Sequence, residues 1–272
     1  MNRPAASNTS KAASELERRA ARAELLLRGA PAAEAPLAFA AGLYRAQASL
    51  AAALESAHVG DPLSGHLDRD VERFFDRTRE VLRFAAESGP RELAEQARAQ
   101  LGDDAATAHA RLAVYWAGDR PTEEDYLSRA LLRPYVEVLR AVNAAPDRVH
   151  RHGRCPFCGG APWVSARRDG STMEGARRML ACSLCGGEWL FGRILCPACF
   201  EEDPGKLPSF KSDVHPTVRI EVCDVCKRYI KSLDLSEDAR PVPEVDDLVS
   251  IAMDLWAIEQ GFTRIEPGLA GI

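Results

Sequence analysis

The sequence predicts an α+β protein, in which a helical N-terminal part precedes a smaller part that cysteines hold together. Two observations support this prediction. Apolar residues recur at helical spacing from about residue 15 to about residue 145, in segments rich in Ala, Leu, Arg and Glu. At "APDRVHRHGRCPFC" the composition changes, and all eight cysteines of the 272-residue chain follow.

The N-terminal part divides into a flexible arm over residues 1–14 and a helical domain over residues 15–148. The arm ends at "SELE", where Ser14 and Glu17 have the spacing of a capping box. Breakers such as "HVGDP", "ESGP" and "LGDD" divide the domain into five or six helices. Two apolar stripes should face its core, one formed by Val71, Phe74, Phe75, Val81 and Leu82, and one, crossed by Pro134, formed by Leu127, Leu131, Val138 and Leu139.

The cysteines form four C-x2-C pairs: Cys155 and Cys158, Cys182 and Cys185, Cys196 and Cys199, and Cys223 and Cys226. One such pair supplies half of a tetrahedral four-sulfur metal site, so four pairs make two sites. The motif C-x2-C-x23-C-x2-C occurs twice, separated by ten residues. This repeat favours two tandem four-cysteine metal modules, at residues 149–192 and 193–235, with an interleaved arrangement as the alternative.

The residue after each pair bears on the geometry of these sites. Gly159 and Gly186 follow the first two pairs, and glycine adopts a positive φ that turns backbone N–H groups toward the thiolates. Phe200 and Lys227 stand there in the last two pairs. We expect these two turns to be more strained or differently hydrogen bonded.

Residues 236–272 should form a C-terminal helix and a tail. The helix is predicted in "VDDLVSIAMDLWAIEQGF", with Gly261 as its stop. One face of it carries Leu248, Ile251, Ala252, Leu255 and Ile258, which should be the buried side.

Charge and hydropathy bear on location and partners. The start of the chain has no leader-like apolar run, and no window of eighteen apolar residues follows, so we expect a cytoplasmic protein without membrane insertion. Thiols stay reduced there, which favours metal ligands over disulfides. The chain has a formal charge of -5, and eight thiolates with two divalent ions change residues 151–235 from +3 to -1. We therefore expect no nucleic-acid partner.

The chemistry that the sequence supports is mainly that of the metal sites. Closed all-thiolate sites are usually structural, although dithiol cycling and iron redox chemistry remain alternatives. An all-sulfur donor set suits both zinc and rubredoxin-type iron. The chain contains no Gly-rich phosphate loop and no nucleophile–base set, so we expect that it is not an enzyme.

Longer stretches around the cysteines resemble a known family. "CPFCGGAPWVS", "RRMLACSLCGGEWLFGRILCPAC", "RIEVCDVCKRYIKSLDL" and "DDLVSIAMDLWAIEQGFTR" occur in the order typical of the FdhE family, accessory proteins of formate dehydrogenase. Glu188 with Trp189, Arg193, Tyr229 to Lys231, and Asp246 to Leu248 make the resemblance specific. The final "EPGLAGI" departs from the pattern of the family.

The resemblance implies a helical domain followed by two rubredoxin-like modules, for which a zinc ribbon is the related all-sulfur alternative. It also implies a cytoplasmic protein that is needed for active formate dehydrogenase and contacts the catalytic subunit of that enzyme. The expected cofactor is iron, two ions per chain, with zinc as the alternative.

These lines together predict a maturation factor that binds a client polypeptide. Glu188, Trp189 and Arg193 lie at the join between the modules and are the candidate client-binding residues, although Trp189 could instead cover the first metal site. A rubredoxin-like electron carrier and a zinc-ribbon nucleic-acid-binding protein are the alternatives. A homo-oligomer remains possible.

Overall fold

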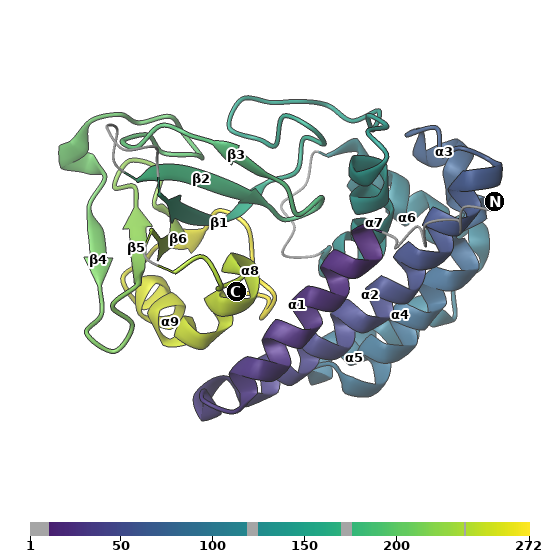
Figure 1. Cartoon of the computed structure of the whole chain (residues 1–272), viewed down its shortest axis with the longest axis horizontal. Helices are drawn as coiled ribbons and strands as arrows, with labels where there is room; N and C mark the ends of the chain where they lie inside the picture. Colours follow the sequence, from purple (N-terminus) through teal and green to yellow (C-terminus); the bar gives the residue numbers. More distant parts are fainter. Residues whose placement is uncertain (1–10, 119–124, 170–175, 237) are drawn as a thin grey trace, which may run out of the picture.

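The computed structural model describes residues 11–118, 125–169, 176–236 and 238–272. In this part of the chain a helical domain lies beside a mixed β-sheet, and the C-terminal helices pack against the sheet (Figure 1). The first ten residues of the expected arm lie outside the described ranges. The fold class predicted from the sequence is confirmed.

The helical domain contains more helices than the five or six expected. Its elements are α1 (Lys11–Leu27), α2 (Glu34–Gly60), α3 (Leu67–Asp70), α4 (Phe75–Ser88), α5 (Arg91–Leu101), α6 (Ala105–Ala117) and α7 (Tyr126–Ala141), with 3-10 turns η1 (Pro31–Ala33) and η2 (Val71–Arg73). Because α1 begins at Lys11, Ser14 lies inside the helix, and the predicted capping box is wrong.

Both predicted apolar stripes pack into the core, apart from Phe75, which is only half-buried. Pro134 lies inside α7 without ending it. A proline has no N–H to donate to the carbonyl four residues earlier. The side chain of Gln47 replaces that donor, since its Nε2 lies 2.7 Å from the carbonyl oxygen of Ala130.

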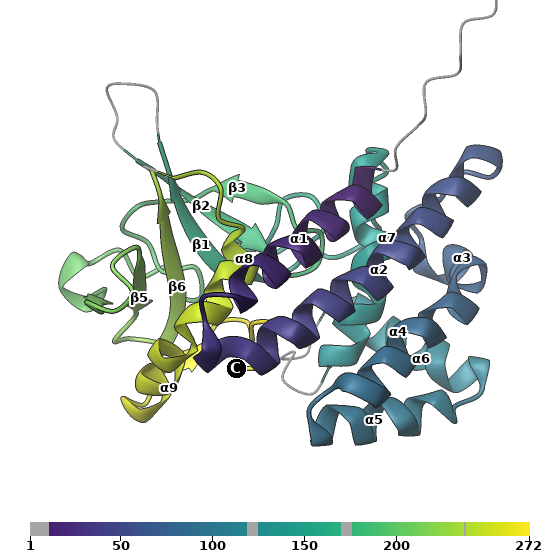
Figure 2. The ribbon, with the colours of Figure 1, turned by 60° about the horizontal axis from the view of Figure 1, so that its bottom comes forward.

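The segment Pro31–Gly60, which is η1 and α2, is long and apolar enough to cross a membrane by composition alone. In the fold, 61% of its most apolar window is buried inside the protein. It packs along α1 and α7 in the middle of the domain (Figure 2). Its composition is therefore accounted for by its place in the core.

The strands come from both cysteine-rich modules and form one sheet. They are β1 (Pro162–Arg168), β2 (Arg177–Cys182), β3 (Glu188–Leu190), β4 (Ser209–Lys211), β5 (Val218–Val222), β6 (Arg228–Leu235) and β7 (Thr263–Arg264). The order is β3-β2-β1-β6-β5-β4, with β7 beside β6. Each module supplies three antiparallel strands, and the parallel pair β1–β6 joins the modules.

The C-terminal helical region is divided into α8 (Pro243–Asp246), η5 (Asp247–Ser250) and α9 (Ile251–Glu259). The predicted buried face is correct at Leu248, which is 2% exposed, but wrong along α9. Leu255 and Ile258 are 51% and 46% exposed, whereas Met253, Asp254 and Ala257 are buried. The predicted stop is confirmed, because α9 ends two residues before Gly261, which has a φ of 82°.

A buried cation explains this rotation of α9. Lys231 on β6 is fully buried, and its Nζ lies 2.6 Å from Asp254 and 3.0 Å from Asp247. Arg264 pairs with the same two carboxylates at 3.1 Å and 2.9 Å. A buried ammonium requires such partners, so Asp254 turns inward and the apolar side of α9 turns outward.

The tail packs back onto the helical domain. Arg129 on α7 pairs with Glu266 at 2.8 Å and donates to the carbonyl oxygen of Pro267. The hydroxyl of Tyr126 donates to the carbonyl oxygen of Leu269 at 2.9 Å. The tail, where the sequence departs from the family pattern, thus links the C-terminal segment to α7.

Candidate metal centres

Each C-x2-C pair lies in a tight turn with the same backbone hydrogen bond. The N–H of its first cysteine donates to the carbonyl oxygen five residues later. The four distances, 2.8 to 2.9 Å, are those from Cys155 to Gly160, Cys182 to Gly187, Cys196 to Glu201 and Cys223 to Arg228. Four turns of one geometry support the duplication read from the cysteine spacing.

The residue after each pair has a positive φ in all four turns. Gly159 and Gly186 have φ values of 69° and 62°, as expected for glycine. Phe200 and Lys227 have values of 65° and 55°, where a side chain is unfavourable. The prediction of strain in the last two turns is therefore confirmed, while their backbone hydrogen bonds match those of the first two.

The first centre gathers the sulfurs of Cys155, Cys158, Cys182 and Cys185, which lie within 4.8 Å of one another. Sγ of Cys155 is 3.6 Å from Sγ of Cys185, and Sγ of Cys158 is 3.4 Å from Sγ of Cys182. All four residues are buried, with exposures of 3% or less. The pairing is sequential, as favoured by the spacing, and not interleaved.

The second centre gathers Cys196, Cys199, Cys223 and Cys226 within the same 4.8 Å limit. The Sγ atoms of Cys196 and Cys226 are 3.7 Å apart, and those of Cys199 and Cys223 are 3.6 Å apart. In contrast to the first centre, Cys199 is exposed and Cys226 is half-buried. The two centres thus share one geometry but differ in their access to solvent.

The donor sets fit a tetrahedral metal ion. Metal–sulfur bonds of about 2.3 Å at tetrahedral angles place the sulfurs about 3.8 Å apart, close to the separations observed. Backbone N–H groups also donate to the sulfurs. The backbone nitrogens of Leu184 and Cys185 each lie 3.4 Å from Sγ of Cys182, and that of Ala198 lies 3.4 Å from Sγ of Cys196. Such bonds orient and tune thiolate ligands.

Ionisation of the first centre also points to a cation. Hydrogen bonds from the three other thiols lower the pKa of Cys155. Hydrogen bonds with Cys155 and Cys182 raise the pKa of Cys158. Burial raises the pKa of Cys182. Four thiolates at these distances would repel one another, and a bound cation would offset that repulsion.

The comparisons with known proteins concern this same part of the chain. Residues 154–193 match the family model of the FdhE central domain, and residues 194–269 match the model of the FdhE C-terminal domain. The part of the chain that holds both centres therefore matches two consecutive FdhE domains. The resemblance inferred from the sequence is thereby confirmed.

Relatives and a solved structure agree with this match. An FdhE homolog from Aquifex aeolicus is 40% identical over 117 residues, which are 43% of this chain and 41% of the relative. One from Pseudomonas aeruginosa is 36% identical over 119 residues, or 42% of this chain and 38% of the relative. These matches thus span about two fifths of the relatives' length. The crystal structure of the FdhE protein from Pseudomonas aeruginosa has the same fold over 95% of both chains, with a TM-score of 0.67 at 23% identity.

Several residues on which the sequence resemblance rests have structural partners here. Tyr229 donates to Asp254 at 3.0 Å, and Lys231 pairs with Asp247 and Asp254. Asp246 accepts from Arg22 of α1 at 2.9 Å. These side chains hold β6, α9 and α1 together, so much of the family pattern describes the fold around the centres.

A second buried cluster, which the sequence analysis missed, ties the first centre to the helical domain. Arg19 of α1 and Arg133 of α7 both pair with Glu137 and Glu244, with Arg19 and Arg133 each 2.6 Å from Glu137. Gly186 of the second turn lies against this cluster. The signal in the sequence was the spacing of Arg133 and Glu137, which stand four residues apart in a predicted helix.

The three candidate client-binding residues occupy different settings. Glu188 on β3 forms a two-bond pair with Arg168 on β1, with both distances 2.7 Å. Trp189 is half-buried and packs against the core. Arg193 is exposed on the segment between β3 and the second module. They lie close in sequence, but only Arg193 is free of a carboxylate partner and exposed among the described residues.

Proposed function

We propose that this protein is an accessory factor needed for formate dehydrogenase activity, and that it binds the catalytic subunit of that enzyme in the cytoplasm. The match of residues 154–269 to the two FdhE domains supports the accessory role. The proposal extends that role to this chain and names the client and the compartment.

The observation that carries the proposal is the union of two closed four-sulfur centres in one sheet fixed to a helical domain. When bound, iron or zinc, two ions per chain, would hold each module in shape, and iron could in addition accept one electron. Cysteine sulfur fills every position of a tetrahedral ion, so no position is left for a substrate. A rigid surface of this kind suits a binding protein better than a catalyst.

We place the client surface at the edge of the sheet around β3. Leu190 and Ile194 are 63% and 55% exposed there, beside Glu188, Trp189 and Arg193. Exposed apolar side chains mixed with arginine and an aromatic residue are the usual composition of a protein interface. Leu190 and Ile194 are absent from the original sequence-based set and extend it.

A deletion strain tests the role. Formate dehydrogenase activity should fall while its catalytic polypeptide is still made, and Cys182→Ser should fail to restore the activity, whereas Arg91→Gln, on an exposed helix surface, should restore it. Unchanged activity after deletion, in a strain without a second copy of this protein, would refute the proposal.

The client surface is tested by co-purification with the catalytic subunit. Trp189→Ala should reduce the amount of subunit recovered while two metal ions per chain are retained. Trp256→Ala, a half-buried tryptophan on α9, is the matched control and should recover the subunit normally. Loss of metal in Trp189→Ala would instead mean that this side chain covers the first centre.

One observation favours a second function, that of an electron carrier. The exposed Cys199 and half-buried Cys226 bring the second centre to the surface, where a partner could approach its sulfur edge. Reversible one-electron reduction of the iron-loaded protein, at a rate that matches turnover of formate dehydrogenase, would favour this function. A protein that is fully active with zinc alone would exclude it.

A further inference from the structure

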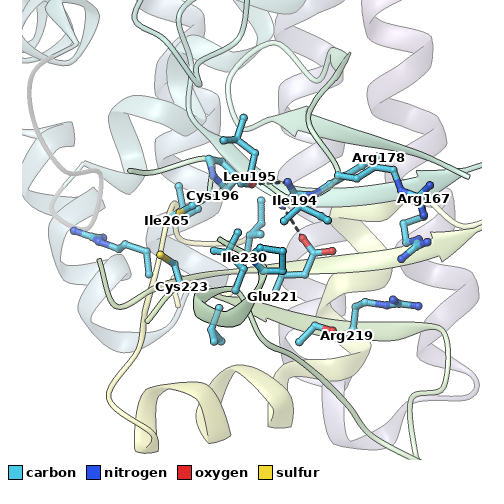
Figure 3. A pocket seen from close by; sticks show the side chains of 17 residues that line it. Arg167, Arg178, Ile194, Leu195, Cys196, Arg219, Glu221, Cys223, Ile230 and Ile265 are labelled. Atoms are coloured by element: carbon cyan, nitrogen blue, oxygen red, sulfur yellow. Dashed lines mark hydrogen bonds and ion pairs between the residues drawn. The ribbon is translucent and has the colours of Figure 1, made fainter. Parts of the chain in front are cut away.

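A cavity of about 190 Å³ lies on the sheet where the two modules meet (Figure 3). Strands β1, β2, β5 and β6, the segment after β3 and the cysteine turns of the second module line it. Arg228 and Ile230 of β6 face the cavity, and side chains alternate along a strand, so Lys231 points to the opposite face, toward α9. The cavity therefore opens on the side of the sheet that α9 leaves uncovered.

The lining of this cavity is strongly cationic. It contains five arginines, Arg167, Arg178, Arg193, Arg219 and Arg228, but Glu221 is its only carboxylate among the described residues. Arg178 takes Glu221 as its partner at 2.7 Å. The four other arginines of the lining therefore have no carboxylate partner within the lining itself.

Partners outside the lining account for only part of this charge. Arg219 lies 3.6 Å from Asp234. Burial by itself would raise the pKa of Asp234. Hydrogen bonds from Ser236 and the charges of Arg167 and Arg219 outweigh burial and lower that pKa. Arg228 donates to a backbone carbonyl, that of Arg264, at 3.1 Å. Arg193 has no carboxylate partner in the described part of the chain, and an excess of positive charge remains.

Two further observations indicate that this positive charge needs a compensating partner. Arg167 and Arg178 are directly opposite each other on the antiparallel strands β1 and β2. Like charges in that position destabilise a sheet unless something compensates them. Arg178 is only 6% exposed, and its Nε is buried without a hydrogen-bond partner in the described residues. A buried donor of this kind is costly unless it is satisfied.

We propose that this cavity binds a small oxyanion, that is, a phosphate or a carboxylate group. Guanidinium groups form paired hydrogen bonds with both, and several of them around one anion offset their mutual repulsion. The cavity has room for one such group together with water. The anion can come from solution or from an acidic side chain of a polypeptide, and the cavity would recognise the same chemistry in both.

The neighbouring metal centre provides the competing explanation. Cys196 and Cys223 also line the cavity, and four thiolates around a divalent ion carry a net charge of -2. The arginines could serve only to balance that charge. In that case their removal would weaken metal retention, and no added anion would bind.

The test is calorimetric titration of the full-length, zinc-loaded protein with inorganic phosphate at low ionic strength. Arg167→Gln/Arg193→Gln should weaken phosphate binding about tenfold or more, because two charge-assisted contacts are lost. The matched control is Arg69→Gln/Arg91→Gln, which removes the same charge from exposed helix surfaces of the other domain and should bind phosphate like the unmodified protein.

A second measurement addresses the buried donor. The Nε–H resonance of Arg178, assigned by its loss in Arg178→Lys, should shift when phosphate is added. A tetraglutamate peptide is then titrated in competition with phosphate. Displacement of phosphate would assign the site to polypeptide carboxylates, and failure to displace it would assign the site to a free anion.

Three results would overturn the proposal. The first is that neither probe binds the unmodified protein. The second is that the Arg167→Gln/Arg193→Gln protein binds phosphate as tightly as the control. The third is that the substituted protein loses zinc from the second centre although no anion binds the unmodified one, which would leave charge balance of the thiolates as the role of the arginines.

Discussion

A methyl group added at Gly160 should disturb the first metal centre. Its carbonyl oxygen accepts the N–H of Cys155 at 2.9 Å in the first cysteine turn. A Cβ added here would lie 2.7 Å from Sγ of Cys182, 3.1 Å from Cβ of Leu184 and 3.3 Å from Sγ of Cys158. The substitution Gly160→Ala therefore acts on two of the four ligands without adding a polar group, and at a φ that is not positive.

The size of the effect follows from these distances. Non-bonded heavy atoms are in optimal contact at about 3.5 to 4.0 Å, so Sγ of Cys182 would have to move by about 1 Å. Metal–sulfur bonds tolerate changes of about 0.2 Å. Overpacking of this kind costs about 1 to 3 kcal/mol, so the affinity of the first centre should fall roughly 5- to 150-fold.

The chain offers a matched comparison at the equivalent position of the second centre. Glu201 stands there, and its carbonyl oxygen accepts the N–H of Cys196 at 2.9 Å. Since this turn already holds a side chain, Glu201→Ala should leave both centres unchanged. Gly29→Ala serves as a general control, because an added Cβ there would have no atom within 4 Å.

The assay is competition for zinc with a chromophoric chelator under oxygen-free conditions, with two ions per chain as the starting state. Gly160→Ala should weaken one ion and leave the other at its original affinity. Original affinity for both ions would refute the geometry of the turn. Equal weakening of both would refute two independent centres.

Three further predictions concern residues with a positive φ and the access of solvent to the second centre. Gly261→Ala should lower the free energy of unfolding in urea by about 1 to 2 kcal/mol, because only the positive φ of this residue is unfavourable for alanine. Gly186→Ala should lower it by roughly 3 to 5 kcal/mol, because the added Cβ would lie 2.4 Å from Nη2 of the buried, paired Arg19. Equal losses in the two variants would contradict this difference. Lys227→Gly should relieve about 1 kcal/mol of strain and slow zinc loss from the second centre, and faster loss would count against it. Because Cys199 is exposed, a chelator should remove one ion early and the other late, and loss of both in a single phase would contradict the difference in access.

Local features of the protein were predictable because they depend on residues close together in sequence. A C-x2-C turn is complete within about six residues, so spacing alone indicated four turns, their duplication and the sequential grouping of sulfurs, as well as the strain at Phe200 and Lys227. Helical periodicity likewise predicted the apolar stripes of the N-terminal domain, and Gly261 correctly marked the end of α9.

Long-range pairing could not be predicted in this way. The parallel pair β1–β6, in which Val164 lies opposite Lys231, merges two expected modules into one sheet, and no pattern within either strand specifies that partner. The same pairing buries Lys231, whose need for carboxylates turns Asp254 inward and reverses the face of α9 that apolar periodicity predicts. Burial of one charge outweighed a helical pattern.

The sequence by itself determined the composition of the two candidate centres, because a tetrahedral sulfur site requires only two short turns brought together. Only the tertiary structure decided which centre is buried and which reaches the surface. It also gathered the arginines of the cavity, which are spread between residues 167 and 228 and meet because β2, β1, β6 and β5 are neighbours in the sheet. Their proximity is a property of strand order, which side-chain spacing along the chain does not encode.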